Sequence, residues 1–122
     1  MTIKRYVVPV TTLADGSATA YSPVLTGRIS AIHYVKTDFA NGVDFAITAE
    51  ATGETLWTED NVNASKSMAP RQATHTTVGV AAVYAAGGAA VLDKIALHAD
   101  RVKIVVASGG DTKTGAFHLV TE

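Results

Sequence analysis

The stretch Val43–Glu59, VDFAITAE-ATG-ETLWTE, decides the fold class of this chain. Along its first half Val43, Phe45, Ile47 and Ala49 share one face, and Asp44, Thr48 and Glu50 share the other. A period of two residues is typical of a strand with one buried face. A short glycine-containing break then leads into a second run of strand-forming residues, so the stretch predicts an antiparallel hairpin.

A second stretch of the same kind is Arg101–Glu122, RVKIVVA-SGGDT-KTGAFHLVTE. Val102, Ile104 and Val106 share one face, and a Gly-Gly turn precedes the next strand-forming run. We expect a second hairpin here. The turn is not expected to hold phosphate, because a phosphate-binding loop runs from a strand into a helix amino terminus.

Further strand-like runs occur at Ile3–Val10, Arg28–Lys36 and Ile95–Ala99, with turn signals between them. The spacing predicts an all-β fold, an antiparallel β-sandwich or jelly roll with seven or eight strands. One long polar loop is expected at Asp60–Thr77. The Ala- and Gly-rich segment Val78–Ala90 is open between a flat strand and a flexible flap, because its three glycines disfavour a helix.

Length and composition predict one domain over residues 1–122. Residues 1–26 are expected to form an extended amino-terminal arm or an edge strand, since Pro9 cannot donate a ladder hydrogen bond. Basic and acidic residues nearly cancel, at a net charge of −1, which argues against a nucleic-acid partner. No apolar run is long enough to span a membrane, and no secretory signal is recognised. The chain contains no cysteine.

The histidines His33, His75, His98 and His118 are scattered singly, without the spacing of a metal site. His98 and His118 are expected on neighbouring strands, close enough to approach each other. Even so, we predict no metal site and no cofactor, and interpret the imidazoles as surface or interface groups.

Carboxylates gather around the first predicted hairpin, and among them Glu50 and Glu54 are the pair that a glycosidase would use. Their alternation instead indicates the solvated face of a hairpin. Trp57 is interpreted as a core residue, with an interface anchor as the alternative. Arg71 follows Pro70 in the long loop. The Pro-Arg pair combines a rigid, extended backbone with a guanidinium that has five hydrogen-bond donors, and both features suit docking. We predict no catalytic residue.

Several of these stretches together resemble the small structural proteins of tailed bacteriophages. The resemblance is carried by Gly27-Arg28-Ile29-x-x-Ile32-x-Tyr34, by Val43-Asp44-Phe45-x-Ile47-Thr48-x-Glu50-x-Thr52-Gly53, by Pro70-Arg71, and by Arg101-Val102-Lys103-Ile104-Val105-Val106 with its Gly-Gly turn. Proteins of this sort are similar to capsid decoration or cement proteins, which are β-sandwich or jelly-roll modules, often trimeric, on the assembled shell.

The resemblance implies a non-enzymatic virion protein, made in the host cytoplasm, that stabilises the capsid surface. Its implied partners are the major capsid protein and further copies of the chain, with a homotrimer favoured. The amino-terminal strand would add to a partner's sheet, and trimerisation would cover the Ala-rich segment. The candidate interface residues are Tyr6, Val8, Pro70, Arg71, Val80 and Tyr84.

Two other roles stay open. The first is a tail, baseplate or head–tail connector component, which differs from a decoration protein in its copy number. The second is a carbohydrate-binding β-sandwich that stacks sugars on Tyr34, Trp57 or Tyr84. An enzyme is the weakest reading, because the chain offers little loop around a cleft.

Overall fold

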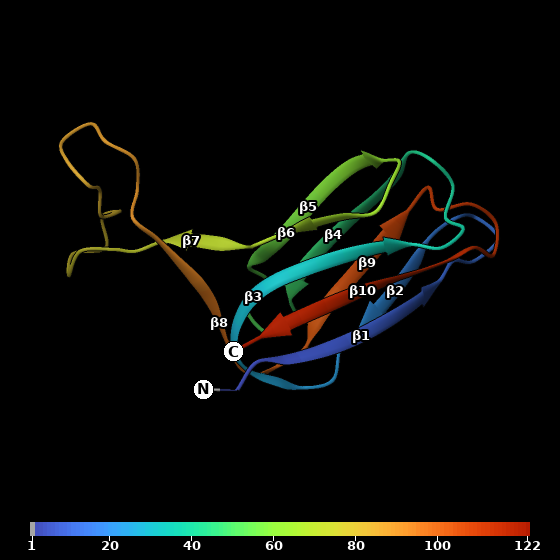
Figure 1. Ribbon diagram of the computed structural model, residues 1–122, viewed down its shortest axis with the longest axis horizontal. Coiled ribbons are helices and arrows are strands. Elements are labelled where there is room, and N and C mark those ends of the chain that lie inside the picture. The colour runs from blue at the N-terminus through green and yellow to red at the C-terminus, as the bar shows by residue number, and fades with distance from the viewer. Residues whose placement is uncertain (1) are drawn as a thin grey trace.

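The computed structural model describes residues 2–122, and every regular element in that range is a β-strand (Figure 1). Ten strands run over β1 Lys4–Thr11, β2 Ala18–Tyr21, β3 Leu25–Lys36, β4 Val43–Ala49, β5 Thr55–Val62, β6 Lys66–Met68, β7 Arg71–Ala73, β8 Leu92–Asp100, β9 Val102–Ala107 and β10 Thr114–Thr121.

The strands form two antiparallel sheets. Sheet A has six strands in the order β1-β10-β3-β8-β7, with β6 also paired to β3, and sheet B has four in the order β2-β9-β4-β5. The predicted all-β sandwich is therefore confirmed. The strand number is higher than the predicted seven or eight, because the expected long loop Asp60–Thr77 contains the end of β5 and the short strands β6 and β7.

The hairpin predicted at Val43–Glu59 is confirmed. β4 pairs with β5 in antiparallel register, with Phe45 opposite Glu59 and Ile47 opposite Trp57. Burial along β4 alternates strictly, as its sequence predicts. The pairing extends to Val62. The register shifts between Val43 and Phe45 and again between Ile47 and Thr48, and such irregularities bend strands locally.

The hairpin predicted at Arg101–Glu122 is wrong in its pairing, although both of its strands exist. β9 lies between β2 and β4 in sheet B, whereas β10 lies between β1 and β3 in sheet A. The connection at 108–113 therefore crosses between the sheets. Thr12 holds this crossing, because its hydroxyl donates to the Gly110 carbonyl (2.6 Å) and accepts from the Lys113 N–H (2.8 Å).

The amino-terminal segment supplies one edge strand to each sheet. β1 lies at the edge of sheet A and pairs along its whole length with β10, from Lys4 opposite Thr121 to Thr11 opposite Thr114. Pro9 is tolerated at this edge because the missing N–H removes no bond that the sheet interior needs. β2 lies at the edge of sheet B beside β9.

The core lies between the inner faces of the two sheets and is built around aromatic rings. The Phe45 ring of sheet B lies 5.3 Å from Tyr34 and 5.1 Å from Phe117 of sheet A, and 4.9 Å from Trp57. All four side chains are at most 3% exposed. Phe39 covers Gly115 so closely that a Cβ there would lie 2.6 Å from its ring, so only glycine fits beneath it.

We expect truncation of Ile104 to destabilise the fold far more than truncation of its neighbour Val105. Ile104 is fully buried and Val105 faces outward, 38% exposed. Ile104→Ala should lower the free energy of unfolding by about 2–5 kcal/mol, because it leaves a cavity. Val105→Ala should lower it by less than about 1 kcal/mol. Urea unfolding measures both, and equal losses would contradict the assigned inner and outer faces.

Candidate interaction surfaces

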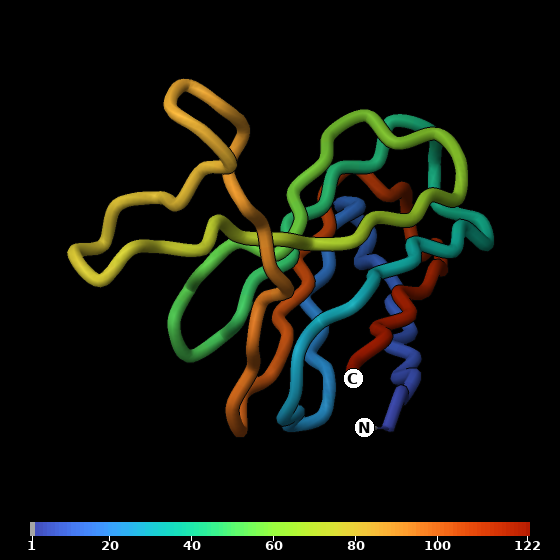
Figure 2. Tube along the Cα trace, turned by 60° about the vertical axis from the view of Figure 1, so that its left-hand side comes forward, coloured from blue at the N-terminus to red at the C-terminus, as the bar shows by residue number. Residues whose placement is uncertain are grey.

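Residues 74–91, here called the arm, project away from the sandwich between β7 and β8 (Figure 2). The flat strand expected as one alternative for Val78–Ala90 is not formed, and the segment is part of this projecting arm. It doubles back twice, with isolated bridges at His75–Ala81 and Val83–Ala90. The Gly79 N–H to Thr76 O (2.9 Å) and Gly88 N–H to Ala85 O (2.8 Å) hydrogen bonds close these turns, and Thr74 N–H to Val91 O (2.8 Å) joins the two ends of the arm.

The arm has no core of its own. No residue from 74 to 91 is buried. Val78 is 82% exposed, Val80 61% and Tyr84 76%, and Leu92 just beyond the arm is 57% exposed. The segment 72–92 contains no Asp, Glu, Lys or Arg. Contiguous exposed apolar groups of this kind mark surfaces that bind other molecules.

The six candidate interface residues fall into different environments. Val80 and Tyr84 lie on the exposed arm, and Arg71 is exposed at its base, where its Nη1 donates to the carbonyls of Ser30 (3.2 Å) and Pro70 (2.7 Å). Tyr6 is partly buried against the core. The other two candidates, Val8 and Pro70, are buried within the chain, so their side chains are already covered.

The prediction that His98 and His118 lie on neighbouring strands is wrong, because β3 separates β8 from β10. His118 instead lies directly opposite His33 on β3, and opposite Val7 on β1. His75 is on the arm. Within residues 2–122 no group of three His, Asp or Glu side chains is arranged to hold a metal ion.

The pair Glu50 and Glu54 flanks the β4–β5 turn and does not form a cleft. Glu50 is bound by Arg101 through two hydrogen bonds of 2.9 and 2.6 Å, and the same guanidinium lies 4.1 Å from the centre of the Tyr21 ring. This arrangement joins β2, the β4–β5 turn and the start of β9, which is a structural role.

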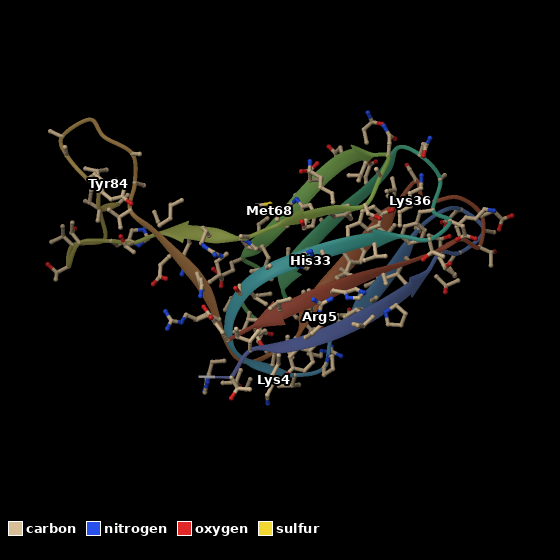
Figure 3. All side chains as sticks on the ribbon, in the orientation of Figure 1. Lys4, Arg5, His33, Lys36, Met68 and Tyr84 are labelled. Atoms are coloured by element: carbon tan, nitrogen blue, oxygen red, sulfur yellow. The ribbon has the colours of Figure 1, made fainter. Side chains whose placement is uncertain are left out.

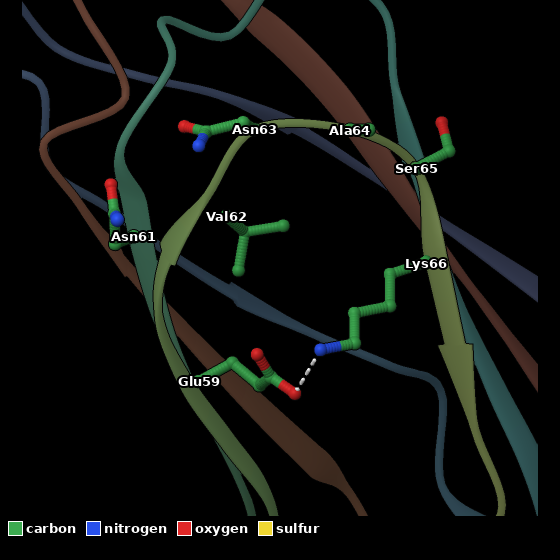
Figure 4. A pocket seen from close by; sticks show the side chains of 7 residues that line it. All are labelled: Glu59, Asn61, Val62, Asn63, Ala64, Ser65 and Lys66. Carbon is green, nitrogen blue, oxygen red and sulfur yellow. Dashed lines mark hydrogen bonds and ion pairs between the residues drawn. The ribbon is translucent and has the colours of Figure 1, made fainter.

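A shallow hollow lies beside the β5–β6 connection, with a volume of about 270 Å³ (Figure 4). Ligand sites usually enclose about 300–1,000 Å³, so this one is small. Glu59 and Lys66 form an ion pair across it, with 2.7 Å between Oε1 and Nζ. The pair connects the edge of sheet B to β6 of sheet A. The hollow therefore lies at the rim of the sandwich.

The aromatic residues considered as a sugar platform are mostly internal. Tyr34 is 1% and Trp57 2% exposed, and burial raises the pKa of the Tyr34 phenol. Trp57 is thus a core residue, as interpreted from its strand. Tyr84 on the arm is the remaining exposed member of the set.

Sequence reasoning named part of the arm but missed Val83 and Leu92, which are also exposed. The uncharged run from 72 to 92 was the available signal.

Among the described residues no helix is long and apolar enough to cross a bilayer.

We expect Lys66→Met to raise the pKa of Glu59. The hydrogen bond from Lys66 holds the pKa of this carboxyl below its usual value. A carboxyl with a lowered folded pKa stabilises the fold above its unfolded pKa, and the contribution is lost as pH falls through the folded pKa. A ¹³C NMR titration of the Glu59 carboxyl measures the change. Lys103→Met, on sheet B, is the control and should leave it unaltered; an unchanged Glu59 titration in Lys66→Met would contradict the assignment.

No protein-family model matches this sequence, and no curated protein matches it. Among solved structures the chain is similar to one from the extra small virus (XSV) VLP of the giant freshwater prawn Macrobrachium rosenbergii, at 10% identity and a TM-score of 0.40, over 98% of this chain and 77% of that one. It is also similar to TmCBM61, solved with beta-1,4-galactotriose, at 11% identity and a TM-score of 0.36, over 93% and 66%. Both scores are below 0.5, and the fold described above rests on the strands of this chain itself.

Proposed function

We propose that this chain is a non-enzymatic structural protein of a virion, and specifically a capsid decoration (cement) protein on the head of a tailed bacteriophage. In this role the sandwich sits on the outer capsid surface and bridges neighbouring major capsid protein subunits. The protein is made in the host cytoplasm and joins the shell as a homotrimer.

The observation that carries the proposal is the arm. A two-stranded hairpin alone is marginally stable in water, and apolar side chains such as Val78 and Tyr84 gain free energy only when they are covered. The sandwich beneath is closely packed, with its core rings between the two sheets. A packed domain with one uncovered apolar extension suits a protein that acts by contacting other subunits.

The composition of the arm also supports association between copies. Its small residues, Ala85 to Ala90, permit close approach of a neighbouring backbone, and its lack of charge removes repulsion between identical arms. A trimer would place three arms together, and many trimers on one shell would gain avidity even where each contact is weak.

We expect the double variant Val80→Ser/Tyr84→Ser to weaken self-association without loosening the sandwich. Removing two apolar side chains that association would bury should lower the association constant about a hundredfold. Sedimentation equilibrium measures association, and thermal unfolding monitors the fold. Val105→Ser, on sheet B, is the matched control and should associate like the parent. A parent chain that stays monomeric at high concentration would contradict the proposed trimer.

We expect the copy number of this chain in purified particles to scale with that of the major capsid protein. Quantitative mass spectrometry of the particles gives this ratio. A tail, baseplate or connector component would instead be present as a single ring, and its copy number would not follow the shell. Absence of the chain from particles would refute a virion role altogether.

A further inference from the structure

The fold separates most of the acidic strands from most of the basic ones, although β8 of sheet A carries Asp93 and Asp100 and β9 of sheet B carries Lys103. The strands β1, β3, β6 and β10 contain no Asp or Glu, and they carry Lys4, Arg5, Arg28, Lys36 and Lys66. The strands β4 and β5 of sheet B contain no Lys or Arg, and they carry Asp44, Glu59 and Asp60. The net charge of −1 does not reveal this separation, because it is a sum over the whole chain. The Lys and Arg residues are on β1, β3 and β6, and β10 contributes His118.

The outer face of sheet A gathers nitrogen donors at its centre. His118 lies opposite His33, and His33 lies opposite Ser67 of β6. Arg5 lies one strand further on, on β1, and Figure 3 labels it together with His33 of β3. The Arg5 Nη1 is 3.2 Å from the His118 Nδ1. Because a guanidinium has no acceptor, Nδ1 must accept this bond, and the proton of a neutral His118 is on Nε2. The group therefore presents free N–H donors outward.

No carboxylate of the four strands competes for these donors. The acidic residues closest along the sheet, Asp93 and Glu122, already form ion pairs with Arg28 and Lys94. Arg5 retains N–H groups beyond the one that contacts His118. A carboxylate from outside the chain would therefore meet donors on this face without displacing an internal partner.

Aliphatic side chains surround the donors. Val7 is 52% exposed and Val35 37%, and Pro9 is exposed beside them. The face thus combines a cationic centre with an apolar surround, which is the arrangement of a protein contact with charge complementarity.

We propose that the outer face of sheet A docks an acidic protein surface, one that presents carboxylates flanked by apolar side chains. Arg5, His33 and His118 receive the carboxylates, and Val7 and Val35 pack on the apolar groups. This surface is separate from the arm and does not depend on the virion assignment.

A nucleic-acid partner fits this face less well. Proteins that bind single strands stack bases on exposed aromatic rings, and duplex binding needs many phosphate contacts. The aromatic residues of these strands, Tyr6, Tyr34 and Phe117, all point toward the core. Only a few cations remain free, and an apolar surround has no counterpart in a phosphate backbone.

The probe for the test is a fluorescein-labelled ten-residue peptide of glutamates and leucines, with a glutamine-for-glutamate peptide as its neutral match. NMR amide shifts of the intact chain locate the site, and fluorescence anisotropy at two salt concentrations gives affinity. We expect binding of the acidic peptide alone, weakened by salt, with shifts in β1, β3 and β10. The variant Arg5→Gln/His33→Gln should bind about fivefold more weakly.

The matched control is Lys103→Gln/Lys113→Gln, which removes positive charge outside this face and should bind like the parent. Equal weakening in the control would overturn the proposal, as would shifts confined to other strands or no binding at low salt. Tighter binding of a ten-nucleotide single strand than of the acidic peptide would assign the face to nucleic acid instead. The shift map of the parent chain tests the site even if a variant folds poorly.

Discussion

The contact of Phe45 with rings from both sheets is the interaction on which the rest of the structure depends. Phe45 belongs to β4 in sheet B, yet it packs against Tyr34 and Phe117 of sheet A and against Trp57 of its own sheet. Such aromatic pairs contribute about 0.5–1.5 kcal/mol each beyond the apolar area that they bury. Because they fix how the sheets face each other, they also determine which residues face outward.

The strands were predictable from sequence wherever one face is buried, because burial imposes a period of two residues. β4 and β10 alternate strictly, and their limits follow from the pattern. The pairing of β9 was not predictable in the same way. A glycine-rich turn reports only that the chain reverses tightly, and the Ser108–Lys113 connection reverses into the other sheet, held by Thr12 from almost a hundred residues away. A hydrogen-bond partner so distant in the sequence leaves no signal in the residues of the turn itself.

The two interaction surfaces likewise differ in how far the sequence predicts them. The arm is one continuous segment, so its lack of charge and its exposed Val80 and Tyr84 could be noticed in the sequence. The cationic face of sheet A is assembled from four separate strands. Its central neighbours, His33 and His118, are 85 residues apart and become adjacent only through the β3–β10 register. Reasoning from spacing alone therefore placed His118 beside the wrong histidine.

The position of β10 has a consequence for biosynthesis. It is translated after the other strands of residues 2–122, yet it lies between β1 and β3, and within that range no other strand pairs with β1. Until it leaves the ribosome, β1 has no partner and β3 has one open side. The nascent chain must therefore expose unpaired strands that are prone to aggregate. Sheet A can therefore close only after β10 has been made, and slow synthesis of this strand would prolong that vulnerable state.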